Sequence, residues 1–359
     1  MKQRTIIPFG PQHPVLPEPL HLKLVLEDEQ VVEAIPALGY IHRGLEGLAT
    51  RRDYNQMIYI VERVCGICSC MHAMCYCHAI EGLMGIEIPR RAKFLRVIWA
   101  ELHRMHSHLL WLGLFADGMG FESMFMALWR VRERILEICE NTAGNRIIIS
   151  VNIMGGVRRD LSPQQVQEIL SDLKIIEAEL KPLYDTMMND YTIKERTVGK
   201  GILTKGQAHE LGAVGAVLRA SGWAQDVRMT GYEIYDELDF EPMVETDGDC
   251  YARTKVRFRE VFQSIELIRG CINKIPNGDL SVKVRGKPEG EITTRVEQAR
   301  GELFYYVKCD GTMNPERVRI RTPTFANIPP LLAMLPGIDL ADVPVVTLTI
   351  DPCISCTER

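Results

Sequence analysis

The stretch ERVCGICSCMH (residues 62–72) holds two cysteines spaced C-x-x-C, and the chain ends on a second such pair in DPCISCTER (residues 351–359). A compact zinc ribbon places its two pairs about 15–20 residues apart. Here nearly the whole chain separates Cys68 from Cys353. The two pairs can therefore share one metal only if the fold returns the end of the chain to its first third.

Cysteine usage favours metal ligation over disulfides. The chain has eleven cysteines, an odd number, and its start, MKQRTIIPFGPQHP, lacks the apolar core of a secretory signal. Reduced thiols or metal ligands are therefore expected. Four thiolates suit zinc, an iron–sulfur cluster, or nickel with iron, and the nearby Arg63 and Arg359 favour their deprotonated form. On spacing alone, a closed structural zinc site explains the pattern as well as a catalytic centre does.

Composition narrows the class of protein. The 359 residues are 46% hydrophobic and 25% charged, which is ordinary for a globular chain. The net charge is −5 and no basic block appears, so nucleic acid is not an expected partner. The most apolar run, LLWLGLFA (residues 109–116), is shorter than the roughly 18 apolar residues of a spanning helix. We therefore expect a protein that is soluble by itself and reaches a membrane only through partners.

Hydrophobic periodicity predicts a mainly α-helical bundle with small β-elements near both ends of the chain. Alternation predicts a β-hairpin over residues 21–38. Ser162 is a predicted N-cap with Pro163 at the first helical position. The other predicted helices and β-rich segments are helices over 43–64, from 90 onward, about 122–141 and about 249–275, and β-segments over 291–298, 302–310 and 317–323.

These elements predict one domain over residues 1–359. It would contain a β-hairpin region over residues 1–40 and a helical bundle over 41–280. An α+β region over 281–359 would then close the metal site.

The residues around the cysteines carry a resemblance. R-V-C-G-I-C-x-x-x-H (residues 63–72) and D-P-C-x-x-C-x-x-R (residues 351–359) resemble the two nickel-binding signatures of NiFe-hydrogenase large subunits. The rest of the chain resembles the membrane-associated, energy-converting group of Ech-type, CO-induced, formate-hydrogenlyase and Mbh-type enzymes. That family includes the 49 kDa quinone-site subunit of respiratory complex I. The stretches concerned are GPQHP (10–14), GYIHRGLE (39–46), GNR (144–146), GGVRRD (155–160), EQARGEL (297–303) and RIRTPTFAN (319–327).

The resemblance implies a nickel–iron centre. Cys65, Cys68, Cys353 and Cys356 would all bind nickel, and Cys68 and Cys356 would also bridge to an iron that carries one CO and two cyanides. The terminal thiolates leave nickel with an open position, which catalysis requires and a closed zinc site lacks. The implied reaction interconverts H2 with protons and electrons, with Cys353 as the first proton acceptor.

Four further residues have implied roles beside this centre. Arg300 matches the arginine that lies over the metals, although a surface arginine in a β-turn is the alternative. Thr324 would donate to a cyanide, or is a simple turn threonine. His72 would hydrogen-bond a bridging sulfur, or is a packed helix histidine. Glu18 matches a proton-relay glutamate, or is a solvated loop residue.

A structural divalent ion, such as Mg, is implied less directly. Glu46 matches a glutamate that helps to hold such an ion in many relatives. Those relatives end on histidine, whereas this chain ends on Arg359, and a guanidinium cannot ligate a metal. The alternative is an ion pair between Arg359 and Glu46. The remaining seven cysteines, together with His103 and His106, are interpreted as packing or interface residues.

The resemblance also implies partners. The chain has no second cluster motif, so electrons would pass to a small subunit with a proximal 4Fe–4S cluster. Ferredoxin-type electron-transfer subunits and integral membrane subunits that pump H+ or Na+ would complete a complex on the cytoplasmic side of the membrane. We expect the apolar flanks of the first cysteine pair, residues 60–64 and 69–82, to contact the small subunit over more than about 2,000 Å².

The sequence is also compatible with two other kinds of protein. A quinone-site subunit of the complex I type shares GPQHP and HRGLE but lacks the nickel-binding cysteines. A non-catalytic scaffold with a zinc site would use the four cysteines for structure alone. Metal analysis separates these possibilities from a hydrogenase.

Overall fold

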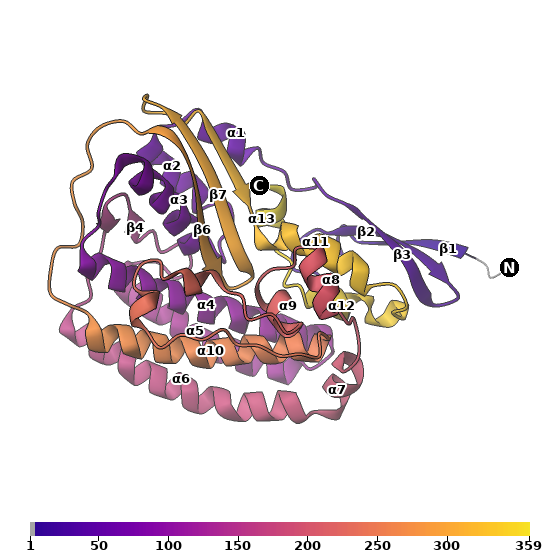
Figure 1. The fold of residues 1–359 in the computed structure, drawn as a ribbon. Coiled ribbons are helices and arrows are strands. Elements are labelled where there is room, and N and C mark those ends of the chain that lie inside the picture. Colours follow the sequence, from indigo (N-terminus) through magenta and orange to yellow (C-terminus); the bar gives the residue numbers. More distant parts are fainter. Residues whose placement is uncertain (1–3) are drawn as a thin grey trace.

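The structure is a computed structural model that describes residues 4–359. Four long helices lie side by side along one side of the molecule, the lower side in Figure 1. The predicted mainly α-helical fold class is confirmed, and the helix after residue 89 is the most deeply buried of the four. The four helices are α4 (Arg90–Gly118), α5 (Glu122–Ala143), α6 (Pro163–Asn189) and α10 (Cys250–Lys274).

Local capping explains where α6 begins. The Ser162 side chain accepts from the Gln165 backbone N–H, and the Gln165 side chain accepts from the Ser162 backbone N–H, forming a capping box. Pro163 occupies the first turn, where its missing N–H costs no hydrogen bond. The predicted start of this helix is confirmed.

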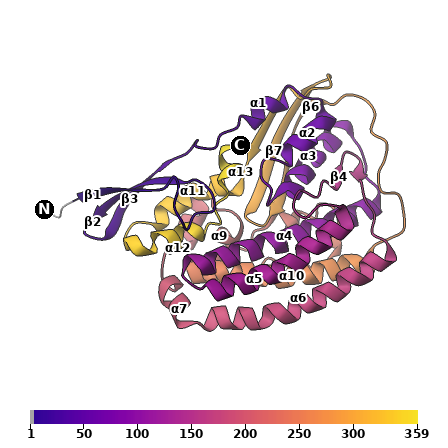
Figure 2. The ribbon, with the colours of Figure 1, turned by 180° about the vertical axis from the view of Figure 1, so that it is seen from behind.

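A three-stranded antiparallel sheet projects from the side of the molecule, next to the C-terminal helices (Figures 1 and 2). The predicted hairpin consists of β2 (His21–Glu27) and β3 (Gln30–Ala37). The edge strand β1 (Arg4–Phe9) was not predicted, because Pro8 argues against a strand unless it lies at a sheet edge. The inner face of the sheet packs with the C-terminal helices in one hydrophobic cluster.

A second sheet covers the first cysteine region. It consists of the strands β6 (Glu289–Gln298), β7 (Gly301–Asp310) and β8 (Arg317–Arg321). Helix α3 (Ser69–Met84) packs against β6 and β7. The three predicted β-segments are confirmed. Gln298 pairs with Gly301, so Ala299 and Arg300 form the tight turn between β6 and β7.

One predicted helix is interrupted in the structure. The segment 43–64 forms two short helices, α1 (Leu45–Ala49) and α2 (Tyr54–Val61). Asp53 separates them because its side chain accepts from the Asn55 N–H and caps α2. The break turns the chain before it reaches the first cysteine pair.

Short elements complete the chain. They connect the bundle to the second sheet and bring the C-terminus back beside α1 and β7 (Figure 1). Within residues 4–359, no helix is both long and apolar enough to cross a membrane. The short elements are β4 (Asn152–Ile153), β5 (Gly156–Val157), α7 (Tyr191–Thr197), α8 (Lys205–Glu210), α9 (Gly215–Ala220), η1 (Val227–Thr230), η2 (Tyr235–Glu237), α11 (Pro323–Met334), η3 (Leu340–Asp342), α12 (Val343–Leu348) and α13 (Ile354–Glu358).

Candidate metal centre

The two distant cysteine pairs meet inside the protein. The Sγ atoms of Cys65, Cys68, Cys353 and Cys356 all lie within 4.8 Å of one another, and each residue is buried. Cys68 Sγ lies 3.2 Å from Cys356 Sγ, and Cys353 Sγ lies 3.2 Å from Cys65 Sγ. All four are free cysteines. The second cysteines of the two motifs are thus neighbours, as two thiolates shared by the same pair of metals would have to be.

Helix starts position these sulfurs. Cys68 is the N-cap of α3, and Cys353 is the N-cap of α13. The positive end of a helix dipole favours a thiolate over a thiol. The pKa of Cys68 is indeed lowered. The hydrogen bond with Cys356 lowers the pKa of Cys353, but hydrogen bonds with Cys65 and Cys68, together with burial, outweigh it and raise that pKa well above its usual value.

Arg43 links the two cysteine loops. Its guanidinium donates to the backbone oxygen of Val64, at 2.6 Å, and to that of Ser355, at 3.0 Å. A third bond reaches the Arg63 oxygen. Arg43 belongs to the GYIHRGLE stretch, but its partners lie in distant segments, so the sequence alone gives no signal for this role.

The four cysteine thiols cannot all be deprotonated unless a positive charge lies among them. Burial raises the pKa of Cys68, but hydrogen bonds from Cys353, Cys356 and Cys65 outweigh it and hold that pKa well below its usual value. Burial and the hydrogen bond with Cys353 raise the pKa of Cys356 well above its usual value. One thiolate is therefore stabilised at the expense of its neighbours. Four soft donors this close can all ionise only around a metal, so the residues fit a nickel–iron centre and also a zinc ion.

His72 lies against Cys356, one of the two neighbouring second cysteines of the motifs. Its Nε2 is 3.4 Å from Cys356 Sγ, and its Nδ1 is 2.7 Å from the Tyr305 hydroxyl. Tyr305 is fully buried on β7 and fixes the imidazole from behind. Tyr305 was missed by sequence analysis, and the inward alternation of β7 was the available signal.

Arg300 projects from the β6–β7 turn toward the second cysteine loop. Its Nη2 lies 2.9 Å from Asp351 Oδ1, its Nε donates to the Asp351 backbone oxygen, and its Nη1 donates to Ser107 Oγ. The residue is only 4% exposed, so the alternative of a surface turn arginine does not apply. Asp351 and Ser107 were not singled out from the sequence.

A cavity of about 400 Å³ reaches Cys353. Arg300, Asp351 and Glu18 contribute its polar atoms, and apolar side chains that include Trp111 and Leu114 contribute the rest. The Glu18 carboxylate accepts from the Ser355 backbone N–H, at 2.9 Å, and from the Ser355 hydroxyl. Glu18 is therefore held at the cysteine loop and is not a freely solvated residue.

Thr324 supports the same loop. Its hydroxyl accepts from the Cys353 backbone N–H at 3.1 Å, and the side chain is fully buried. The residue lies beside the cysteine cluster, and its donation to a cyanide stays a prediction. The same hydroxyl donates to the Asp351 backbone oxygen, with 3.5 Å between the two oxygen atoms.

The Glu46 carboxylate is occupied by donors from the protein itself. It accepts from Arg359 Nε at 2.9 Å, from the Ile320 N–H and from Arg319. Burial opposes ionisation, but the hydrogen bonds from Arg359 and Ile320 lower the pKa of Glu46 below its usual value. A guanidinium stands where a divalent ion would need a ligand, so these residues do not fit Mg.

The other seven cysteines, His103 and His106 are core residues. The other seven cysteines are buried, and burial raises the pKa of Cys75 to about 12 and that of Cys309 to about 11. His103 and His106 form a buried edge-to-face pair, and burial lowers the pKa of His103 to about 4. They pack as neutral rings, in agreement with the packing interpretation.

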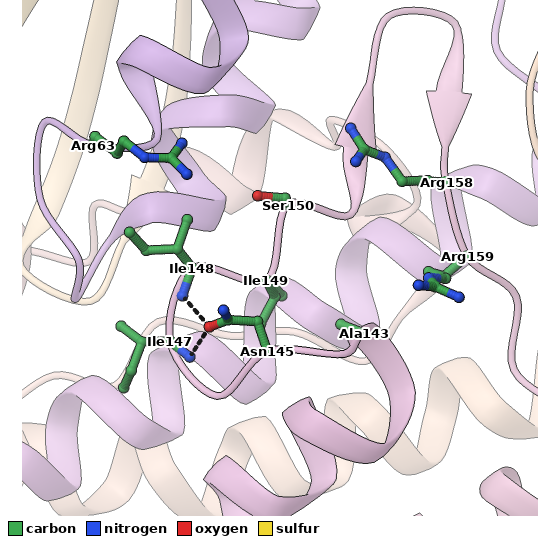
Figure 3. Close-up of a pocket in the computed structure, with 9 residues that line it drawn as sticks. All are labelled: Arg63, Ala143, Asn145, Ile147, Ile148, Ile149, Ser150, Arg158 and Arg159. Atoms are coloured by element: carbon green, nitrogen blue, oxygen red, sulfur yellow. Dashed lines mark hydrogen bonds between the residues drawn. The ribbon is translucent and has the colours of Figure 1, made fainter.

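The predicted partner contact of residues 69–82 is wrong. Nearly all of these side chains are buried between β6, β7 and the bundle, so they cannot meet another chain. The surface beside the cysteine loop is a basic pocket of about 460 Å³, lined by Arg63, Arg158 and Arg159 (Figure 3). Ile147 of this pocket packs against Gly66, between Cys65 and Cys68.

Family matches agree with this geometry. The family described as "Nickel-dependent hydrogenase" matches residues 43–115. The family described as "Respiratory-chain NADH dehydrogenase, 49 Kd subunit" matches residues 118–286 and 280–359. The chain belongs to the oxidoreductase family that unites nickel-dependent hydrogenase large subunits with the 49 kDa subunit of respiratory NADH dehydrogenase.

Individual relatives refine this placement. The chain is 40% identical to the carbon monoxide-induced hydrogenase of Rhodospirillum rubrum, over 98% of this chain and 99% of the relative. It is 38% identical to the membrane-bound hydrogenase subunit alpha of Pyrococcus furiosus, over 98% and 87%. It is also 37% identical to one of the subunits of the F(420)H(2) dehydrogenase of Methanosarcina mazei, over 99% and 97%. The family therefore includes hydrogenase subunits and subunits of other oxidoreductases.

A solved structure shares the whole fold. A chain of the membrane-bound sulfane sulfur reductase, an archaeal respiratory membrane complex, matches with a TM-score of 0.95 and 31% identity. The match covers 100% of this chain and 99% of that chain. Because such different complexes use one fold, the activity has to be argued from the site residues.

Proposed function

We propose that this chain is the catalytic subunit of a membrane-associated, ferredoxin-linked NiFe-hydrogenase that interconverts H2 with protons and electrons. The observation that carries the proposal is the convergence of four buried, free cysteines within 4.8 Å. The cavity that ends at Cys353 supports catalysis over a closed zinc site, because a purely structural metal needs no access. A quinone-binding site would not use four clustered thiols, because they are metal ligands.

The chain's own side chains supply the surroundings of this chemistry. Cys65, Cys68, Cys353 and Cys356 would hold nickel, and Cys68 and Cys356 would also hold iron with its CO and two cyanides. When bound, that centre supplies the redox chemistry of H2 cleavage. The hydrogen bond from His72 to Cys356 stabilises negative charge on a bridging sulfur.

Protons would move along the cavity wall. The Cys353 sulfur accepts the first proton, and the Glu18 carboxylate, which lines the same cavity, receives it next. The buried Arg300 guanidinium holds a fixed positive charge at the cavity, and its ion pair with Asp351 aims it. Apolar neighbours such as Trp111 keep bulk water out of this path.

Electrons would leave through a partner. We place the small subunit with its 4Fe–4S cluster at the basic pocket of Arg63, Arg158 and Arg159, since a cluster held by four thiolates is negatively charged (Figure 3). The similarity to membrane-bound complexes supports integral membrane subunits that couple turnover to ion pumping. The whole assembly would lie on the cytoplasmic side of the membrane.

The direct test is metal content. The purified complex should contain nickel, and Cys68→Ser should lose both nickel and the iron held outside the 4Fe–4S clusters, because Cys68 is shared by the two metals. Cys75→Ser, at a buried cysteine outside the centre, is the matched control and should keep both metals. Zinc in place of nickel in the wild-type complex would refute the proposal.

A further inference from the structure

Seven charged side chains form a buried ionic cluster beside the β6–β7 turn and outside the cysteine centre. None is more than 5% exposed. Ion pairs connect helices α4, α9 and α10 with η1 and β6 through this cluster. The members are Glu101, Arg104, Arg219, Asp226, Arg228, Glu260 and Glu297.

Glu297 is the member that connects the cluster to the turn. Its Oε1 accepts from Arg219 Nη1 at 2.8 Å, and its Oε2 accepts from the Val227 N–H at 3.1 Å. Its backbone oxygen accepts from Arg104 Nη2 at 2.6 Å, and its N–H donates to the Tyr232 hydroxyl. The end of β6 is therefore fixed from four directions.

Arg300 follows three residues later, and α9 also touches its backbone. A side chain at Gly215, the first residue of α9, would place its Cβ 2.2 Å from the Arg300 backbone oxygen. Gly215 has φ +66, a conformation that favours glycine. The same short helix thus holds Glu297 through Arg219 and meets Arg300 through Gly215.

We propose that Glu297 is a positioning residue, through which the buried ionic cluster fixes the β6–β7 turn and aims the Arg300 guanidinium at the Cys353 cavity. Four carboxylates face three guanidiniums in the cluster, an arrangement that is costly to desolvate. Apolar side chains of similar volume would fill the same space without a desolvation cost. Unlike the ionic cluster, however, they would form no directional bonds that hold the two-residue turn, and with it the Arg300 side chain, in one conformation.

The substitution Glu297→Gln separates positioning from folding. The Gln oxygen still accepts from Arg219, but the new NH2 group faces the Val227 N–H, so donor meets donor. Arg219 keeps Glu260 and Asp226 as partners and is not left unpaired. The matched control is Glu260→Gln, which changes a buried carboxylate of the same cluster that makes no contact with the turn.

Hydrogen exchange tests the positioning directly, whether or not the metal is bound. Because burial and the neighbouring Asp226 raise the pKa of Glu297 to about 7, the measurement is made at pH 8, where its carboxylate is charged. In the complex, Glu297→Gln should speed exchange at residues 298–301 about tenfold, while Glu260→Gln leaves these amides unchanged. Equal exchange in wild type and Glu297→Gln would overturn the proposal.

A double-mutant cycle tests the link to Arg300, and this part rests on the proposed hydrogenase activity. Glu297→Gln alone should reduce H2 turnover about tenfold, but should have almost no further effect in an Arg300→Lys background, because both changes act through the same group. Independent, multiplying effects would contradict it. If the complex holds no nickel and never turns over H2, the proposed function fails, and the exchange measurement still decides the role of Glu297.

Discussion

Arg300 carries the clearest prediction at the scale of single residues. Arg300→Lys keeps the charge but loses the planar group that reaches Asp351 and Ser107 together. We expect full nickel occupancy and H2 turnover reduced on the order of 100-fold. Turnover and nickel content are measured on the same preparation, and near-normal turnover with full nickel would rule Arg300 out as a catalytic group.

The buried carboxylate of Glu233 makes the stability of the fold depend on pH. Burial disfavours the charged form of Glu233, but interactions with Arg96 and His78 outweigh burial and lower its pKa from 4.5 to about 2. A lowered pKa stabilises the fold above pH 4.5, and this contribution is lost as pH falls toward 2. Glu233→Gln should therefore lower the melting temperature at pH 7 and lower it progressively less between pH 4.5 and 3. A constant difference across this range would contradict the assignment.

Residue identities could be predicted where a short motif contains them. The four cysteines, His72 and Arg300 all lie in motifs of a few residues, and the structure brings them together. Their supporting partners Tyr305, Ser107 and Arg43 come from distant segments. Local sequence carries no signal for such contacts, because tertiary packing alone creates them.

The C-terminal helix α13 carries the main prediction at the scale of elements. The residue that follows it, Arg359, pairs with Glu46 while both side chains are 19% exposed. Arg359→Ala should loosen α13, speed hydrogen exchange at residues 354–358 and lower nickel retention, because Cys356 lies on this helix. Arg319→Ala is the control, since Arg319 also pairs with Glu46 but is 57% exposed and should contribute under about 1 kcal/mol. Equal effects of the two variants would contradict this account.

Elements with local signals were predictable, and elements that depend on distant contacts were not. The start of α6 follows from Ser162 and Pro163, which act within one turn. The interruption between α1 and α2 depends on the Asp53 cap, a signal that the apolar periodicity of the segment concealed. Strand β1 depends on pairing with β2 and contains Pro8, so its local sequence argued against it.

At the scale of the whole molecule, the surface beside the cysteine loop is where the proposed small subunit would dock. An apolar, cysteine-rich segment can equally be core or interface when read from sequence. In the structure, α3 is core and the basic pocket is exposed. The packing of α3 against β6 and β7, which no local pattern encodes, makes this difference.

Charge reversal tests the docking surface. The double substitution Arg158→Glu and Arg159→Glu should weaken association with the small subunit at least about tenfold and reduce its dependence on ionic strength. Lys174→Glu, an exposed charge on α6, is the control and should leave association unchanged. Affinity is measured between separately purified subunits, and an unchanged affinity of the double variant would place the interface elsewhere.

Infrared spectroscopy of the purified complex tests the central claim most directly. A nickel–iron centre on Cys65, Cys68, Cys353 and Cys356 predicts one CO band and two cyanide bands, which shift when H2 replaces argon and disappear in Cys68→Ser. These bands arise from the diatomic ligands alone, so 4Fe–4S clusters in partner subunits do not contribute to them. A complex with all its subunits but without these bands would contradict the account, whatever other metal the four cysteines held.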